Sequence, residues 1–281
     1  MISADARSSL SSSHEKALQR AFIQLENQNF AARLADYAGQ PVDRVLRMIP
    51  RIASRRVHRA IEIAILQCLN LAIRSIDQSA RRPPSKQLSS LMAGINGGVS
   101  GFFGAAALPI ELPLTTALML RAIADIARHY GEDLSQVEAR LACVEVFALG
   151  AHGAQKRLDV GYYATRALLS KLAGDASAYL IERSAVSAST PVVNSLVSEI
   201  ASRFGLIVSE RFAASALPVI GAVGGATVNV IFMEHFQRVA QGHFIIRRLE
   251  RLYGSAPVQQ QYDELLLGHA RSGVLRKAAS D

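Results

Sequence analysis

The stretch that decides the fold runs from residue 94 to residue 113 and reads GINGGVSGFFGAAALPIELP. It holds five glycines, and its first charge is Glu111, between Pro109 and Pro113. The stretch overlaps an uncharged segment of 24 residues, 87–110, which is long enough to span a bilayer. Its polar and glycine content favours a buried core helix, with an interfacial or reversibly inserting segment as the alternative.

A second uncharged, glycine-rich segment covers 212–233. A shift of 123 residues places Tyr130-Gly131 on Tyr253-Gly254, so we predict two related helical hairpins, a pseudo-repeat. Glycines at short helical spacing let a second helix approach closely. The predicted packing positions are Gly94, Gly97, Gly98, Gly101, Gly221 and Gly225. A phosphate cradle is disfavoured because the stretch lacks the P-loop lysine and a preceding strand.

The chain is predicted to be all-α, a multi-helix bundle with the two glycine-rich hairpins at its centre. Alanine and leucine, both strong helix formers, dominate the apolar residues. No segment keeps the period-two alternation of a strand. We expect helices at 13–37, 41–48, 51–76, 113–131, 133–150, 158–183, 191–204 and 206–216. A further amphipathic helix should end at Gly254, and a terminal helix or tail should follow a loop at Pro257.

The basic residues cluster in one stretch. Residues 43–86 hold ten Lys or Arg and three acids, nearly the whole net charge of +8. Arg51, Arg55 and Arg59 recur every fourth residue and form a stripe on one helix. The patch suits an anionic partner, with a solvated basic face as the alternative. The predicted membrane- or anion-binding residues are Arg51, Arg55, Arg56, Arg59, Arg81 and Arg82.

Several classes of site lack a signature. Cys68 and Cys143 lie in apolar helical patterns and are expected to be buried free thiols. No Cys/His spacing suits a metal, so we predict no metal and no cofactor. Nucleic-acid binding is disfavoured, since the basic patch has no recognised motif and no interleaved aromatics. The N-terminus has no secretory signal, which predicts a cytoplasmic protein.

Three blocks of the sequence resemble the EcsC protein family: 97–134, 140–150 and 216–254. The resemblance covers about 40–260 and implies an EcsC-like helical domain at 39–256. A polar tail and first helix (1–38) would precede it, and a C-terminal helix and tail (257–281) would follow it. The family is linked to an ABC-type exporter, and some members carry peptidase or hydrolase labels. The resemblance places an acidic family position at Glu111, where many relatives carry aspartate.

A candidate polar cluster is drawn from charged and amide residues in apolar surroundings. Glu111 is either a proton carrier or cation contact, or a carboxylate at a helix N-terminus. Salt bridging and catalysis are both open for the acids and arginines, and Asn229 would bond a helix or a substrate. The full set is Glu111, Arg121, Asp125, Arg128, Glu145, Asn229 and His235.

Two functions follow from these patterns. The first is a non-enzymatic protein, peripheral on the inner face of the cytoplasmic membrane. Its partner would be an anionic membrane surface or a membrane protein such as an ABC-type transporter, to which it would be an accessory. The alternative is a hydrolase or peptidase-like enzyme with its site around Glu111, although no G-x-S-x-G or H-E-x-x-H motif is present.

Overall fold

The computed structural model describes residues 10–26, 30, 33, 51–75, 108–151, 161–183, 190–215 and 221–278. Side chains are described within 10–26, at 30 and 33, and within 58–73, 112–151, 161–180, 190–211 and 227–268. This part of the chain forms helices and no strand, which confirms the all-α prediction. The helices are α1 (Ser12–Glu26), α4 (Arg51–Ser75), α6 (Leu108–His129), α7 (Val137–Leu149), α8 (Tyr162–Arg183), α9 (Pro191–Ser215), α10 (Gly221–Tyr253) and α11 (Ser255–Ala278).

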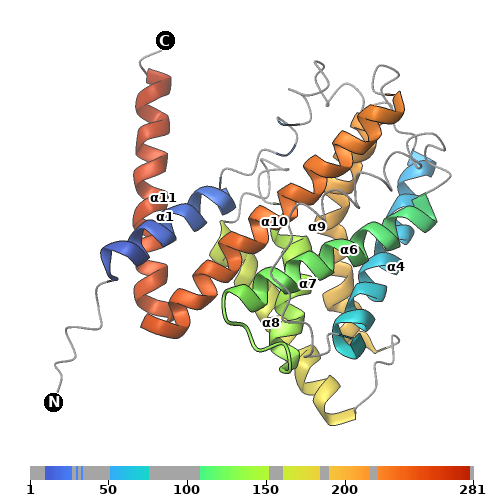
Figure 1. The fold of residues 1–281 in the computed structure, drawn as a ribbon, viewed down its shortest axis with the longest axis horizontal. Helices are drawn as coiled ribbons and strands as arrows, with labels where there is room; N and C mark the ends of the chain where they lie inside the picture. Colours follow the sequence, from blue (N-terminus) through green and yellow to red (C-terminus); the bar gives the residue numbers. More distant parts are fainter. Residues whose placement is uncertain are drawn as a thin grey trace.

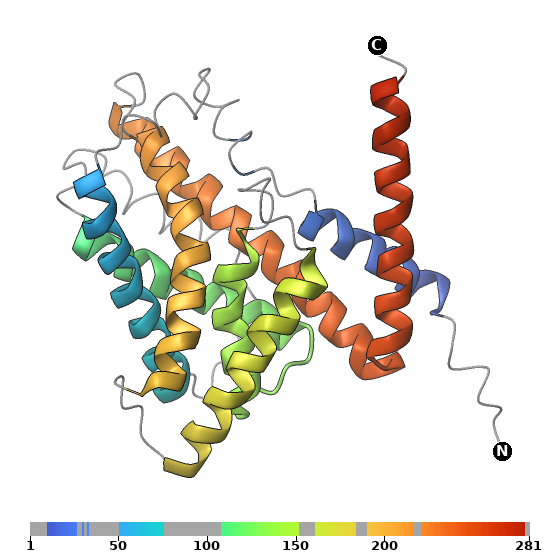
Figure 2. The ribbon, with the colours of Figure 1, turned by 180° about the vertical axis from the view of Figure 1, so that it is seen from behind.

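The helices pack into a bundle with an arm, and α10 belongs to both. Helices α4, α6, α7, α8 and α9 form the bundle, and α10 runs diagonally out of it (Figure 1). Helices α1 and α11 pack against α10 and each other at its C-terminal part, on the far side from α4 (Figures 1 and 2). Because α7 contacts α4, α6, α8, α9 and α10, it is the central helix of the bundle.

Aromatic side chains fill the centre of the bundle. Phe147 of α7, Phe204 of α9, and Phe232 and Phe236 of α10 meet with ring centroids 5.1–6.0 Å apart. A Cβ on Gly150 would lie 2.4 Å from Phe236, so only glycine lets the end of α7 approach this ring. The core therefore depends on a close helix contact at a glycine that the sequence analysis did not single out.

A second close contact docks α1 on α10. A Cβ on Gly242 would lie 2.8 Å from Leu25 and 3.1 Å from the backbone oxygen of Ala21. The two helices run antiparallel. Gln24, near the end of α1, bonds Gln241 at 3.2 Å, whereas the start of α1 meets the end of α10. There His14 Nδ1 lies 2.7 Å from the Tyr253 hydroxyl. The apolar face of α1 thus seats on a glycine groove that α10 provides.

Two predicted helix starts were wrong. Helix α6 begins at Leu108, so Pro113 lies inside it and does not open it. Pro113 is the sixth residue of α6, beyond the first four amides that lack an intrahelical partner, so it removes one backbone hydrogen bond from the helix. Asp133 does not start α7: its carboxylate accepts the Ser135 amide at 2.9 Å in a turn, and α7 begins at Val137.

Two predicted breaks are also absent. Helix α9 runs unbroken through Gly205, where the groove left by the glycine accepts Ile61 of α4. The loop expected at Pro257 does not exist, because α11 begins at Ser255 and a proline fits its first turn. Gly131 and Gly254, with φ of 83° and 88°, end α6 and α10 where we predicted, in the left-handed region that favours glycine.

Some predictions fall outside the described residues. Gly94, Gly97, Gly98 and Gly101 lie outside them, as do 41–48, Arg81 and Arg82. Gly221 and Gly225 are helical residues in the first turns of α10, but their packing is not among the described contacts. The glycine-rich hairpins and the pseudo-repeat therefore stay predictions. Cys68 and Cys143 are buried free thiols, as predicted.

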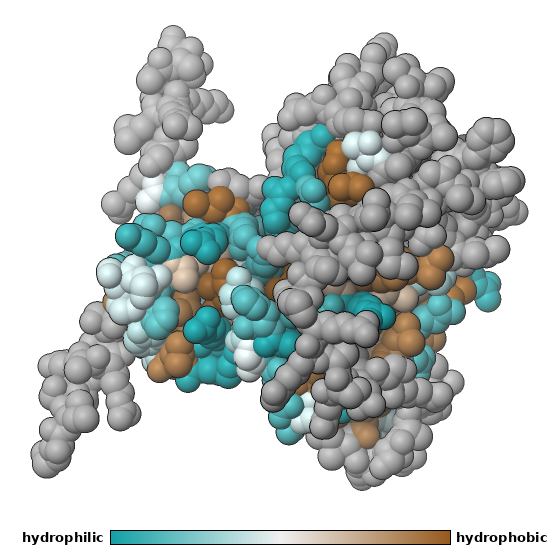
Figure 3. All heavy atoms as spheres, in the orientation of Figure 1, coloured by the Kyte–Doolittle hydropathy of each residue, from teal (hydrophilic) through white to brown (hydrophobic). Residues whose placement is uncertain are grey.

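The exposed surface mixes polar residues with scattered apolar ones. Large exposed apolar side chains are spread over six helices: Ile23, Ile63, Leu71, Leu114, Leu168, Leu252, Leu266 and Leu267. The face in Figure 3 correspondingly shows hydrophobic patches separated by hydrophilic residues. Among the described helices, Pro191–Arg211 of α9 could cross a bilayer by length and composition, although 44% of its apolar window is buried in the fold.

We expect Gly242→Ala to destabilise the protein by about 1–3 kcal/mol, because the added methyl meets the α1 backbone and overpacks the crossing. Urea unfolding with limited proteolysis of α1 measures the effect. Gly174→Ala is the matched control, since nothing lies within 4 Å of its Cβ and alanine favours a helix by up to about 1 kcal/mol. Equal responses of the two variants would contradict the close approach.

Candidate functional site

A set of buried and half-buried charged side chains gathers beside the C-terminal half of α10. This helix supplies His243, Arg247, Glu250 and Arg251, which recur at three- and four-residue spacings and so share one side of the helix. Their partners come from α8, from α7 and from the turn between α6 and α7. We call these residues and their partners the α10 polar cluster.

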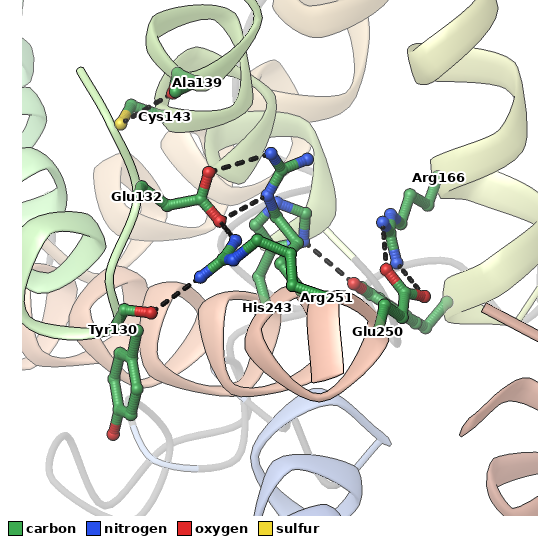
Figure 4. Close-up of polar contacts among 10 residues, drawn as sticks. Tyr130, Glu132, Ala139, Cys143, Arg166, His243, Glu250 and Arg251 are labelled. Carbon is green, nitrogen blue, oxygen red and sulfur yellow. Dashed lines mark hydrogen bonds and ion pairs between the residues drawn. The ribbon is translucent and has the colours of Figure 1, made fainter. Parts of the chain in front are cut away.

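Glu132 is the most tightly held carboxylate of the cluster. Its side chain is 4% exposed and lies in the turn that follows Gly131. Arg247 donates to its two oxygens from Nε and Nη2, both at 2.9 Å, and Arg251 Nη1 adds a third bond (Figure 4). Burial alone would raise the pKa of Glu132, but the hydrogen bonds and charges of Arg247 and Arg251 lower it below its usual value.

A second paired carboxylate joins α8 to α10. Arg166 forms a two-bond fork with Glu250, at 2.7 and 2.6 Å, and the Tyr163 hydroxyl donates to the same carboxylate at 3.1 Å. The backbones of α8 and α10 do not pack closely, so long side chains make this link. Both partners are largely buried, with 16% and 12% of their side chains exposed, and such a pair holds the helices in one register.

A neutral histidine lies next to these pairs. His243 is fully buried, and its Nδ1 lies 2.9 Å from the Tyr162 hydroxyl. Burial, then the charges of Arg166 and Arg247, hold its pKa well below the usual value. Its Nε2 has no hydrogen-bond partner in the described structure. On the outer side, Glu26 of α1 accepts the Tyr262 hydroxyl of α11 at 2.6 Å and the Tyr162 amide of α8 at 3.5 Å, which ties the arm to the same region.

Glu145 is the buried acid of the cluster whose pKa is raised. It sits in the central helix α7 and is 5% exposed. Burial raises its pKa to about 7, and the charges of Arg247 and Arg166 offset only part of that shift. An acid with a pKa near 7 exchanges its proton in the physiological range, so the cluster can bind or release one proton near neutral pH.

The cluster contains an acid that can exchange a proton and two sets of ion pairs. The thiol next to it, that of Cys143, is not reactive. Cys143 donates to the Ala139 carbonyl at 3.4 Å, and burial raises the pKa of this thiol far above its usual value. A buried thiol of this kind stays protonated and is a poor nucleophile. In the described ranges, no three His, Cys, Asp or Glu side chains are placed to hold a metal ion.

Comparison with known proteins gives one match. The EcsC protein family matches residues 12–249, which is most of the chain. The chain belongs to the EcsC protein family. No curated protein and no solved structure matches it. The matched region includes α1, which the resemblance over 40–260 had left outside. It contains His243 and Arg247 of the cluster, whereas Glu250 and Arg251 lie just beyond its end at residue 249.

The residues predicted for the site of this EcsC protein do not all meet. Arg128 and Asp125 pair at 3.0 Å on α6, as their spacing predicted, and Arg121 is exposed on the same helix. Glu145 lies within electrostatic reach of Arg247 and Arg166, whose charges lower its pKa, and no ion pair of Glu145 is among the described contacts. Glu111 is in the first turn of α6, and its side chain lies outside the described residues.

Two further predicted residues lie deep in α10, away from the exposed surface. Asn229 is 1% exposed. The His235 ring donates from Nε2 to the Gly150 carbonyl at 2.7 Å, and burial lowers the pKa of His235 to about 4. His235 therefore stays neutral and ties α10 to the end of α7.

The sequence analysis missed most of the α10 polar cluster. The patterns around Arg166, Arg247, Glu250 and Arg251 are typical of an exposed charged helix surface, and Glu132 lies in the short turn after Gly131. One signal was present: Tyr-Gly stops follow both α6 and α10, and Arg251 donates to the Tyr130 carbonyl at 2.7 Å. The two helix ends that look alike in sequence thus contact each other in space.

We expect Glu132→Gln to lower the free energy of unfolding by about 1–3 kcal/mol, because two arginines lose the carboxylate that they share. The loss should be present at pH 7 and shrink below the usual carboxyl pKa, since a lowered folded-state pKa stabilises only the ionised form. Chemical denaturation at pH 7 and pH 4 measures this. A loss of equal size at both pH values would contradict the pairing.

Glu145→Gln should have the opposite pH dependence. The folded protein holds the Glu145 proton up to about pH 7, whereas the unfolded chain releases it near 4.5, so unfolding becomes easier as pH rises between these values. Glutamine carries no charge, so the variant should be more stable than the wild type at pH 8, by about 1–3 kcal/mol, and similar near pH 4.5. Lower stability of the variant at pH 8 would show that the ionised carboxylate is needed.

Proposed function

We propose that this EcsC protein is non-enzymatic and binds the anionic inner face of the cytoplasmic membrane as a peripheral protein. The observation that carries the proposal is a meeting of helix ends. The starts of α4, α6 and α10 and the end of α9 gather at one end of the bundle, far from the arm, in both ribbon views (Figures 1 and 2). We call this the α4 end.

The α4 end holds the start of α4, which carries the basic stripe in sequence, together with the described helical ends of both uncharged segments. Arg51, Arg55, Arg56 and Arg59 lie in the first turns of α4. The uncharged segment 87–110 leads into α6 at Leu108, and the segment 212–233 connects α9 to α10. Basic residues beside apolar chain are the combination that favours binding to anionic lipid, by headgroup attraction together with apolar contact.

The described part of α4 supports the same orientation. Arg59 is exposed, and the exposed face continues with apolar Ile63 and Leu71, which are 45% and 40% exposed. On α6, which packs against α4, Leu114 is 49% exposed. Ile63 and Leu114 would add apolar contact beside the basic start of α4, whereas Leu71 lies near the opposite end of this helix.

Vesicle co-sedimentation tests the proposal. The wild type should pellet with vesicles of phosphatidylcholine and phosphatidylglycerol but not with phosphatidylcholine alone. Arg51→Glu, Arg55→Glu and Arg59→Glu together should weaken binding roughly 100-fold, at about 1 kcal/mol per basic residue. Higher salt should reduce wild-type binding, because exposed charges are screened.

The matched control makes the same charge change at three positions away from the start of α4. Lys16→Glu, Arg121→Glu and Lys171→Glu change three exposed residues of α1, α6 and α8. This triple variant lowers the net charge by the same amount as the α4 variant, but it should leave vesicle binding near the wild-type level. Equal weakening by both triple variants would reduce the effect to net charge. Equal pelleting of the wild type with both kinds of vesicle would overturn the proposal.

A further inference from the structure

The first half of α11 is anchored to its neighbours by Tyr262, which is 1% exposed. The Tyr262 ring lies edge-on to Phe22 of α1 and Tyr163 of α8, with ring centroids 5.2 and 5.1 Å apart. Its hydroxyl donates to Glu26 of α1 at 2.6 Å. These contacts hold the first half of α11 against α1 and α8.

The second half of α11 has no comparable packing among the described contacts. Leu266 and Leu267 are 37% and 59% exposed. Both ribbon views show α11 crossing α1 and continuing past it (Figures 1 and 2). A helical stretch of about a dozen residues gains little stability from its backbone alone, so a surface that covers it would stabilise it.

The charge of α11 changes along its length. The two acids of the helix, Asp263 and Glu264, lie in the anchored half, and the sequence has no acid in 265–280. Three basic residues lie toward the C-terminal end of the helix: Arg271, Arg276 and Lys277. We call residues 270–278 the α11 tip. The tip is therefore a basic helix end that projects beyond the packed part of the arm.

The α11 tip and the α4 end lie on the same side of the molecule. In Figure 1 the tip is at the top left and the starts of α4 and α10 are at the top right. Both stay at the top in Figure 2, which is turned about the vertical axis, whereas the corner between α10 and α11 is at the bottom in both views. One extended surface can therefore meet both basic helix ends.

We propose that the α11 tip is a second contact with anionic lipid, so that one bilayer meets the tip and the α4 end together. This assignment rests on the proposed function, because both contacts are with the same membrane. Three basic residues without an acid among them complement the phosphates of lipid headgroups. Because Tyr262 holds α11 in the fold, the second contact forms within a molecule that is already bound, which strengthens binding and fixes the orientation of the bundle.

Co-sedimentation with vesicles of phosphatidylcholine and phosphatidylglycerol tests the second contact. Arg271→Glu, Arg276→Glu and Lys277→Glu together should weaken binding roughly 100-fold, as expected for three basic residues at a lipid surface. The α4 variant and the matched control for net charge are measured in the same assay. Weakening by the α4 variant, with the α11 variant at the level of the control, would overturn the α11 contact and leave the proposed function intact. No binding of the wild type would overturn both.

A fluorescent probe reports on the tip directly, because the chain contains no tryptophan. The emission of Leu275→Trp should shift to shorter wavelength with vesicles that contain phosphatidylglycerol and stay unchanged with phosphatidylcholine alone. Leu252→Trp is the matched control, since Leu252 is 57% exposed and lies at the end of α10, beside the corner on the opposite side. Equal shifts of the two probes, or no shift of Leu275→Trp while the protein pellets, would overturn the proposal.

A DNA duplex in place of the vesicles tests the other anionic partner. The wild type and the α11 variant should show the same weak binding to the duplex at physiological salt. If the α11 changes abolish duplex binding and leave vesicle binding unchanged, the tip binds nucleic acid and the lipid contact is overturned.

Discussion

The structure depends on the pairing of buried carboxylates with arginines of α10. Glu132 is 4% exposed and could not stay ionised there without Arg247 and Arg251. These two residues fix the turn between α6 and α7 against α10, and the fork of Arg166 and Glu250 fixes α8 against the same helix. Two segments that are distant from α10 in sequence are thus held against it by charged side chains.

Helix α10 has two halves with different chemistry. Its first half supplies Phe232 and Phe236 to the aromatic centre of the bundle, where packing is non-directional. Its second half supplies the ion pairs and the groove at Gly242 that seats α1. The apolar half can bury many neighbours in more than one arrangement, whereas forked ion pairs accept one geometry, so the second half sets the register of the arm and of the turn.

The helical class, most helix ends and the buried thiols could be predicted from the sequence because they depend on local rules. The left-handed ends at Gly131 and Gly254 and the pair of Asp125 and Arg128 follow from spacing alone. The α10 polar cluster could not be predicted, since a charged residue near a helix end has the same pattern whether it faces water or a partner. Glu145 stood out as the single charge in the apolar stretch 141–149, but the charges near it depend on how α7 and α10 meet.

Glycine spacing illustrates the same limit. The sequence drew attention to clustered glycines, yet the closest described approaches are at the isolated Gly150 and Gly242. An isolated glycine in a helix has no local signature, because what requires it is an atom of another segment. Predicting these contacts requires knowing which helices cross, and that is a property of the whole bundle.

One residue joins the two long helices of the arm. Gly254 alone separates α10 from α11, in a backbone conformation with φ of 88°. No loop lies between them to absorb a rotation, so the direction of α11 is set by two dihedral angles and by its contacts with α1 and α10. A rotation of α11 would therefore have to occur at Gly254 or break its contacts with α1 and α10. Any force on α11 reaches α10, the helix that holds the ion pairs, through this single residue and these contacts.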